Sequence, residues 1–120
     1  MAGDVPEELT GIYCATYQEA IELVGRRWSG VILRAMLTGA TRFSEIRDAI
    51  PELTDRMLSE RLKELENRGI IERRVLPTTP VRISYHLTPK GEDLRDVVIG
   101  LQRWAEQWAD QPAGSSTASR

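Results

Sequence analysis

The chain has 120 residues, of which 41% are hydrophobic and 28% are charged, so it can form one domain with a modest core but hardly two, and wholesale disorder is excluded. No stretch approaches the roughly 18 apolar residues of a membrane-spanning helix, and the acidic N-terminus lacks the basic and apolar regions of a signal peptide. The single cysteine, Cys14, cannot form an internal disulfide. We therefore expect a cytoplasmic single-domain protein that has no membrane partner.

The formal net charge of −2 conceals three segments of different charge. Residues 1–25 contain five acids and no lysine or arginine, and residues 26–90 contain thirteen basic residues and eight acids. Residues 91–120 contain three basic residues and five acids. A basic middle segment between acidic ends predicts that the middle meets an anionic partner while the ends do something else.

Helical periodicity predicts four helices in the first part of the chain, at residues 17–25, 27–37, 42–50 and 55–69. Thr41 is placed to cap the third helix, and Thr54 is placed to cap the fourth. The apolar residues expected on the inner side of the second helix are Trp28, Val31, Ile32, Ala35 and Met36.

After Gly69 the apolar period changes to two residues, which predicts strands at 70–76 and 81–87 that are joined by a loop at 77–80. Thr88-Pro89 then predicts the start of a closing helix. One apolar stripe along that helix consists of Leu94, Val97, Val98, Leu101, Trp104 and Trp108.

This order of elements predicts a mainly α fold with a small β-hairpin, the winged helix-turn-helix. We expect a flexible N-terminus at residues 1–10 and the folded domain at 11–110. Residues 111–120 are small and polar, and we expect them to form a disordered tail.

The fourth predicted helix has a leucine stripe on one side and a polar side opposite. A helix in the major groove contacts bases with its N-terminal turns, which leaves Asn67 too far along. The candidate DNA-binding residues on this helix are Thr54, Arg56, Ser59, Glu60 and Lys63. The alternative is an ordinary solvated helix face.

Arg73, Arg74 and Arg82 lie near the end of the predicted hairpin, where a wing approaches the DNA backbone or the minor groove. Charged residues that protect the edge of a sheet are the alternative. Helix and hairpin together favour nucleic acid as the partner. The other reading of the chain is a winged helix that docks a protein; an enzyme is not expected, because no phosphate loop, metal cluster or nucleophile–base pair is found.

The segments VGRRWSGVILRAMLTGATRF, LSERLKELENRGII and YHLTPKG resemble the HxlR-type winged helix-turn-helix regulators, which are bacterial relatives of the MarR-like regulators. The resemblance extends from about Cys14 to Trp108. It implies a cytoplasmic homodimer that binds operator DNA and regulates transcription, with Arg42 near a phosphate. It also implies a dimer interface made by the first and last helices, for which the candidate residues are Tyr17, Ile21, Leu94, Val98, Leu101, Trp104 and Trp108.

Some members of this family sense oxidants or electrophiles through an N-terminal cysteine that resembles Cys14. Sensing requires an exposed thiol with a lowered pKa, and the alternative is a small packed residue. The chain departs from the family pattern at Ala15, where proline is usual, and at Arg26-Arg27. A small-molecule effector pocket beside Trp104 and Trp108 is a further candidate, with core packing as the alternative, and no cofactor or metal is expected.

Overall fold

The structure is a computed structural model that describes residues 4–110. Its elements are a 3₁₀ helix η1 (Glu7–Leu9), α1 (Ala15–Gly25), α2 (Ser29–Leu37), α3 (Phe43–Ala49), α4 (Asp55–Asn67), β1 (Ile71–Leu76), β2 (Arg82–Leu87), α5 (Pro89–Glu92) and α6 (Arg95–Trp108). This order confirms the predicted mainly α winged helix-turn-helix fold. The predicted tail at 111–120 and the first three residues of the predicted flexible N-terminus lie outside the described residues.

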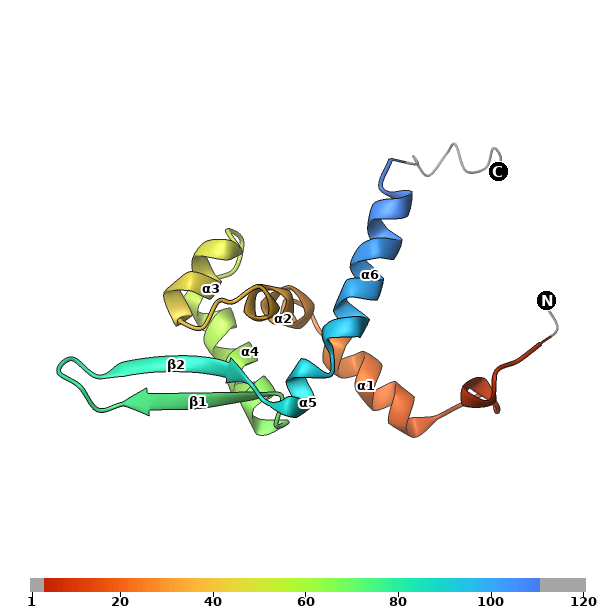
Figure 1. The fold of residues 1–120 in the computed structure, drawn as a ribbon, viewed down its shortest axis with the longest axis horizontal. Helices are drawn as coiled ribbons and strands as arrows, with labels where there is room; N and C mark the ends of the chain where they lie inside the picture. Colours follow the sequence, from red (N-terminus) through yellow and green to blue (C-terminus); the bar gives the residue numbers. More distant parts are fainter. Residues whose placement is uncertain (1–3, 111–120) are drawn as a thin grey trace.

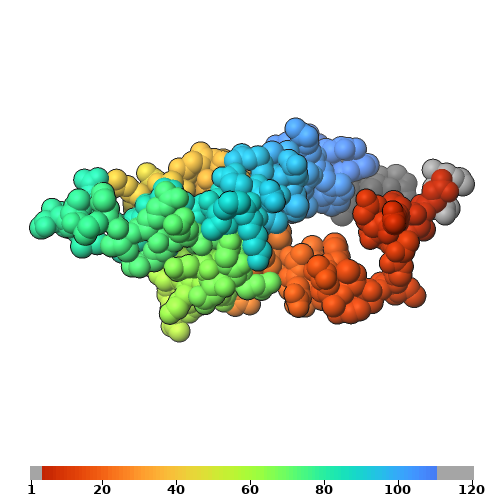
Figure 2. All heavy atoms as spheres, turned by 60° about the horizontal axis from the view of Figure 1, so that its bottom comes forward, coloured from red at the N-terminus to blue at the C-terminus, as the bar shows by residue number. Residues whose placement is uncertain are grey.

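The molecule is elongated, with a helical body between a hairpin and two helical arms (Figure 1). Helices α2, α3 and α4 form the body, and the hairpin of β1 and β2 extends from one end of it. Helices α1 and α6 leave the body at the opposite end as separate arms, coloured orange and blue in Figure 2, with open space between them. The hairpin and the two arms therefore present distinct surfaces.

The core joins α2, α3, α4 and the start of β1. Its buried hydrophobic residues are Ile32, Leu33, Ala35, Met36, Ile46, Ile50, Leu53, Leu58, Leu62, Leu65, Ile70 and Ile71. The prediction for α2 was wrong at one position, since Val31 is 45% exposed and Leu33 is fully buried in its place. Leu33 is buried because other elements pack against α2 on more than one side. The buried surface of α2 is therefore wider than a single stripe.

Helix α2 begins at Ser29, two residues later than predicted. The delay has a local cause: Ser29 N–H donates to the Arg26 carbonyl at 2.9 Å, and Trp28 has a φ of 76°, in the left-handed region. A bulky residue rarely adopts this conformation, so the turn at residues 26–28 is held by its surroundings.

The hairpin is antiparallel, and its register runs from Ile71 opposite Leu87 to Leu76 opposite Arg82. Side chains alternate between the two faces of such a ladder, and the face that carries Ile71, Tyr85 and Leu87 packs on the core. The Tyr85 N–H also donates to the Thr41 carbonyl at 2.7 Å, which attaches β2 to the loop before α3.

The predicted closing helix is interrupted, and the structure contains α5 and α6 in its place. The prediction of the start was correct, since the Thr88 side chain caps α5 with Pro89 in its first turn. At the junction the Leu94 N–H donates to the Gly91 carbonyl at 3.0 Å, a tighter i→i−3 bond, and Leu94 packs against the core. Burial of Leu94 explains why the chain turns here, although the sequence pattern continues.

The start of α5 packs closely against Ile70, in the segment between α4 and β1. Thr88 donates its N–H to the Ile70 carbonyl at 3.0 Å, and its hydroxyl accepts from the Gly91 N–H at 3.1 Å. A Cβ atom on buried Gly91 would overlap the Ile70 carbonyl oxygen and touch the Leu87 side chain. Only glycine therefore allows this approach of two backbones.

We expect Gly91→Ala to lower the free energy of unfolding by at least about 2 kcal/mol, because the backbone of Ile70 has to move. The matched control is Gly100→Ala in the interior of α6, where a Cβ atom meets nothing within 4 Å. That change should raise stability by about 0.5–1 kcal/mol through helix propensity. Urea unfolding followed by circular dichroism measures both, and equal effects of the two substitutions would refute the packing argument.

Candidate nucleic-acid interface

Helix α4 exposes one polar side to solvent because its opposite side is buried in the core. Thr54 caps the helix as predicted, and its hydroxyl accepts from the Met57 N–H at 3.1 Å. Leu58, Leu62 and Leu65 are at most 1% exposed. The residues that remain exposed on the opposite side include Arg56, Ser59, Glu60, Lys63 and Asn67.

Two of these exposed residues pair with each other. The Arg56 guanidinium lies 3.3 Å from the Glu60 carboxylate, one helical turn away, and the Arg56 side chain is 89% exposed. An ion pair this exposed contributes little to stability, about 0.3–0.5 kcal/mol for this spacing. Breaking this ion pair therefore costs little free energy, so each side chain is available to another polar partner.

A hollow of about 340 Å³ between α4 and the hairpin brings residues from both elements together. Ser59 and Lys63 line it from α4, and Arg73 and Tyr85 line it from the strands. We call it the α4–hairpin hollow. It places the cation Arg73 of β1 beside the polar side of α4, an arrangement suited to an anion that spans both elements.

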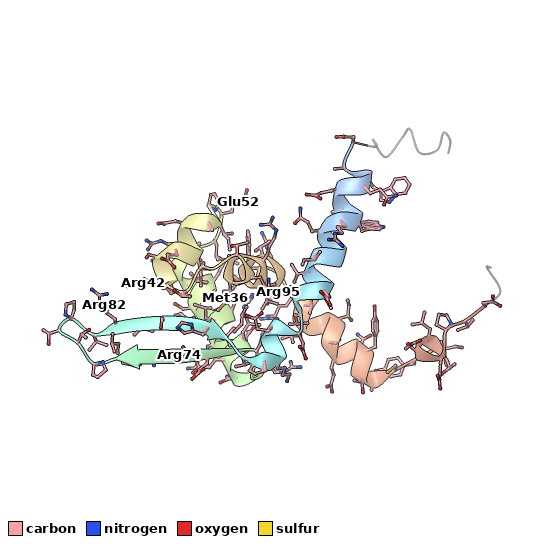
Figure 3. The ribbon with its side chains drawn as sticks, in the orientation of Figure 1. Met36, Arg42, Glu52, Arg74, Arg82 and Arg95 are labelled. Atoms are coloured by element: carbon pink, nitrogen blue, oxygen red, sulfur yellow. The ribbon has the colours of Figure 1, made fainter. Side chains whose placement is uncertain are left out.

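A second hollow, of about 490 Å³, lies between the start of α3 and the end of the hairpin and is lined by Arg42 and Arg82. Figure 3 shows these two arginines on the same side of the molecule and Arg74 at β1. Arg74 instead forms an ion pair of 3.2 Å with Glu72 on its own strand. Arg73 thus shares a hollow with Ser59 and Lys63, and Arg82 shares one with Arg42, whereas Arg74 lines neither hollow.

Arg42 is held in place by the N-terminal cap of α3. The cap was predicted to be Thr41, and this prediction was wrong. The cap of α3 is the Glu45 carboxylate, which accepts from the N–H groups of Thr41 at 2.9 Å and Arg42 at 3.1 Å. These two backbone hydrogen bonds lower the pKa of Glu45 from its ordinary value. Thr41 cannot cap α3 because Arg42, not Thr41, is the residue that immediately precedes the helix.

Arg61 is a buried residue of α4 that the sequence pattern did not single out. It is only 9% exposed, and its Nε donates to the Arg27 carbonyl at 2.9 Å, across 34 positions of sequence. Glu64 lies 3.5 Å from Arg61 and 2.8 Å from Arg26. The signal was available, since Arg61 lies one turn from both Leu58 and Leu65 and thus borders the leucine stripe.

A helix-turn-helix with exposed polar residues on its second helix and arginines on a hairpin is the geometry of a DNA-binding module. The family model that describes the HxlR-like helix-turn-helix matches residues 23–113. The chain belongs to the HxlR-like family. It is a transcriptional regulator of the helix-turn-helix type.

Curated and solved relatives agree with this assignment. The chain is 45% identical over 97 residues to the HTH-type transcriptional regulator YodB of Bacillus subtilis, a match that covers 81% of this chain and 87% of the relative. The crystal structure of diamide-treated YodB matches with a TM-score of 0.70 and 45% identity, covering 82% of this chain and 97% of that one. The redox regulator HypR in its reduced form matches with a TM-score of 0.75 and 33% identity, covering 80% and 95%.

The candidate dimer residues of this HxlR-like chain divide into two groups. Exposed residues on the arms are Tyr17, Ile21, Leu101, Trp104 and Trp108. Leu94 instead packs against the core, and Val98 is half-buried on the side of α6 that faces α2. Leu94 and Val98 are thus partly covered within one chain, because the break between α5 and α6 turns Leu94 toward the body.

Cys14 is an exposed free thiol immediately before α1. Its Sγ accepts from the Tyr17 N–H at 3.5 Å. Within a single chain, Cys14 is therefore not packed in the core.

Two further observations concern the part of the chain that the structure describes. Residues 4–110 contain no group of three or more histidine, cysteine, aspartate or glutamate side chains that could hold a metal ion. Within the same residues, no helix combines the length and the apolar character that crossing a membrane requires.

Proposed function

We propose that the chain acts as a homodimer that binds a roughly palindromic operator and regulates transcription there, in the cytoplasm. Each chain inserts the N-terminal turns of α4 into the major groove, and the hairpin follows the adjacent backbone. The observation that carries the proposal is the polar side of α4 together with the α4–hairpin hollow, where Ser59, Lys63 and Arg73 adjoin. The hollow has two cations, Lys63 and Arg73, against one acid, Glu66, which favours an anionic partner over a docked protein, and the relatives are named as transcriptional regulators.

The proposed contacts fall into two classes. Arg56, Glu60 and Lys63 reach base edges, since arginine and lysine pair with guanine and glutamate accepts from cytosine. The proposed contacts to phosphate and sugar oxygens are Thr54, Ser59, Arg42, Arg73, Arg74 and Arg82. Two-fold symmetry places the half-sites about 34 Å apart, one turn of DNA.

We expect Arg56→Ala and Lys63→Ala each to weaken operator binding by about 10–100-fold, the value of a good base contact. The matched control is Arg68→Ala, which removes the same charge from the end of α4, outside the proposed face. Arg42→Ala should act on all sequences equally and reduce the slope of log affinity against log salt by about 0.9. Fluorescence anisotropy on a footprinted operator measures these values, and wild-type affinity in both α4 variants would refute the assignment of α4.

The arms support the proposed homodimer. Tyr17 and Ile21 on α1 and Leu101, Trp104 and Trp108 on α6 expose large apolar surfaces. Exposed apolar surface of this kind marks an interface, and aromatic residues dominate the binding energy of interfaces. A second copy of the chain offers the same surface in return, as a two-fold interface requires.

We expect Leu101→Glu to raise the dimer dissociation constant at least about tenfold, because a carboxylate would be buried without a partner. The control is Leu76→Glu, which introduces the same charge at a leucine of the hairpin that is 55% exposed, against 60% for Leu101. Sedimentation equilibrium measures both variants. A dimer that tolerates Leu101→Glu as well as Leu76→Glu does not use this side of α6.

We also propose that oxidation of Cys14 releases the operator. Two exposed Cys14 thiols, one from each chain, would lose two electrons and two protons to an oxidant such as diamide and form an intersubunit disulfide. YodB has been solved in a diamide-treated form and HypR is named a redox regulator, which supports this proposal.

We expect diamide to weaken operator binding by the wild type at least about fivefold, the lower range of coupling between two sites. Cys14→Ser should bind the operator normally and should not respond, because it has no thiol to oxidise. Non-reducing electrophoresis of the same samples detects the linked dimer. Release of Cys14→Ser by diamide would exclude Cys14 as the sensor.

A further inference from the structure

Two side chains of α4 attach this helix to the end of α1. Arg61 is buried, and its Nε donates to the Arg27 carbonyl at 2.9 Å. The Glu64 carboxylate lies 2.8 Å from Arg26 Nε and 3.5 Å from Arg61 Nη1. Helix α1 ends at Gly25, so Arg26 and Arg27 are the two residues that immediately follow it. These contacts therefore hold the chain where α1 leaves the body (Figure 1).

The turn that they hold does not have a favourable conformation of its own. Trp28 has a φ of 76°, and a bulky residue keeps this conformation only where its surroundings impose it. Trp28 Nε1 and Arg61 Nη1 are also buried without a hydrogen-bond partner within residues 4–110, which lowers stability. The cluster is thus a poor stabiliser of the fold. What it does provide is a defined direction of the chain between α1 and α2.

We propose that Arg61 is a positioning residue that fixes the direction of α1 relative to α4, and thereby the spacing of the half-sites that a dimer recognises. Its side chain is directed into the protein and reaches no DNA. It acts through the carbonyl of Arg27, and Glu64 supports it by holding Arg26.

The effect on spacing rests on the proposed function, because it requires a dimer that is joined through its arms. Helix α1 carries Tyr17 and Ile21 of the proposed dimer interface, so its direction determines where the body of the partner chain lies. With 11 residues, α1 is about 16 Å long. A tilt of about 12° at one end displaces the other end by about 3.4 Å, the rise of one base pair. A fixed turn therefore selects one spacing, and a loose turn accepts its neighbours.

Arg61→Met is the main test variant, because it removes the hydrogen bond and keeps an unbranched side chain beside the leucine stripe. Apolar replacement of buried ionic groups is often neutral for stability, and Glu64 stays paired with Arg26. Arg61→Lys retains a donor and should restore part of the function. Glu64→Gln weakens the same attachment from a partly exposed position and covers the case in which Arg61→Met does not fold. The matched control, Arg68→Met, removes a cation from the end of α4.

Electron–electron resonance between two spin labels measures the direction of α1 without DNA. One label is placed on the native Cys14, before α1, and the other on Glu52→Cys, an exposed position on the body (Figure 3). Dilution into unlabelled chains restricts the signal to pairs within one chain. We expect Arg61→Met to displace or broaden the distance distribution by at least about 3 Å, the scale of one base pair, and Arg68→Met to leave it unchanged. Wild-type distributions in both Arg61→Met and Glu64→Gln would overturn the proposal.

Fluorescence anisotropy on operators with half-sites one base pair closer or farther apart measures the effect on DNA binding. One base pair moves a half-site by about 3.4 Å and rotates it by about 34–36°. Wild type should therefore lose at least about tenfold in affinity, roughly the cost of one base contact, and Arg61→Met should lose less than about threefold. Loss of stability alone would weaken binding to every spacing by the same factor. An unchanged ratio between spacings in Arg61→Met would refute the role of Arg61 in spacing.

The two measurements distinguish failure of this inference from failure of the proposed function. The label distances require neither DNA nor a dimer, so they decide whether Arg61 positions α1 even where operator binding fails. Unchanged distances, together with normal operator binding, would refute the positioning role alone. Wild-type affinity that is independent of spacing would refute the dimeric recognition of a palindrome, and the role of Arg61 in spacing with it.

Discussion

Burial of one narrow side of α4 is the constraint on which the rest of the structure depends. Leu58, Leu62 and Leu65 are almost completely inaccessible, and each contributes about 1.5–3 kcal/mol when it leaves water. Because a helix is rigid, burying these leucines also determines which side faces outward. The same packing that stabilises the body thus presents Arg56 and Lys63, and no loop has to fold on DNA to create that side of α4.

Arg61 connects α4 to the turn between α1 and α2. Its guanidinium holds the carbonyl of Arg27, and Glu64 is shared between Arg61 and Arg26. Only the Arg61 side chain is buried, at 11% exposed against 41% for Glu64, so the cost of leaving water falls mainly on Arg61 and is offset by its hydrogen bond to the Arg27 carbonyl. The turn that contains left-handed Trp28 is therefore attached to α4, the helix proposed to contact DNA.

The sequence predicted what depends on local pattern and missed what depends on contacts between distant residues. The α4 stripe, the Thr54 and Thr88 caps and the hairpin follow from spacing and residue type alone. The late start of α2 and the turn at Leu94 depend on tertiary packing, which no periodicity encodes. The same holds for the candidate interface. Helical periodicity alone identified the exposed polar residues of α4. Which hairpin arginine adjoins them depends on strand register and on the bond between Tyr85 and Thr41.

Helix α6 carries two surfaces of different character on opposite sides. At 100° per residue, Val97, Leu101, Trp104 and Trp108 face one direction, and the residues that line a groove between α6 and α2 face the other. A partner chain on the apolar side therefore leaves the groove side facing α2. Leu94, the residue that precedes α6, packs against the core and attaches the start of this helix to the body. Because α6 has 14 residues, a small tilt at its start would displace Trp108 more than Val98.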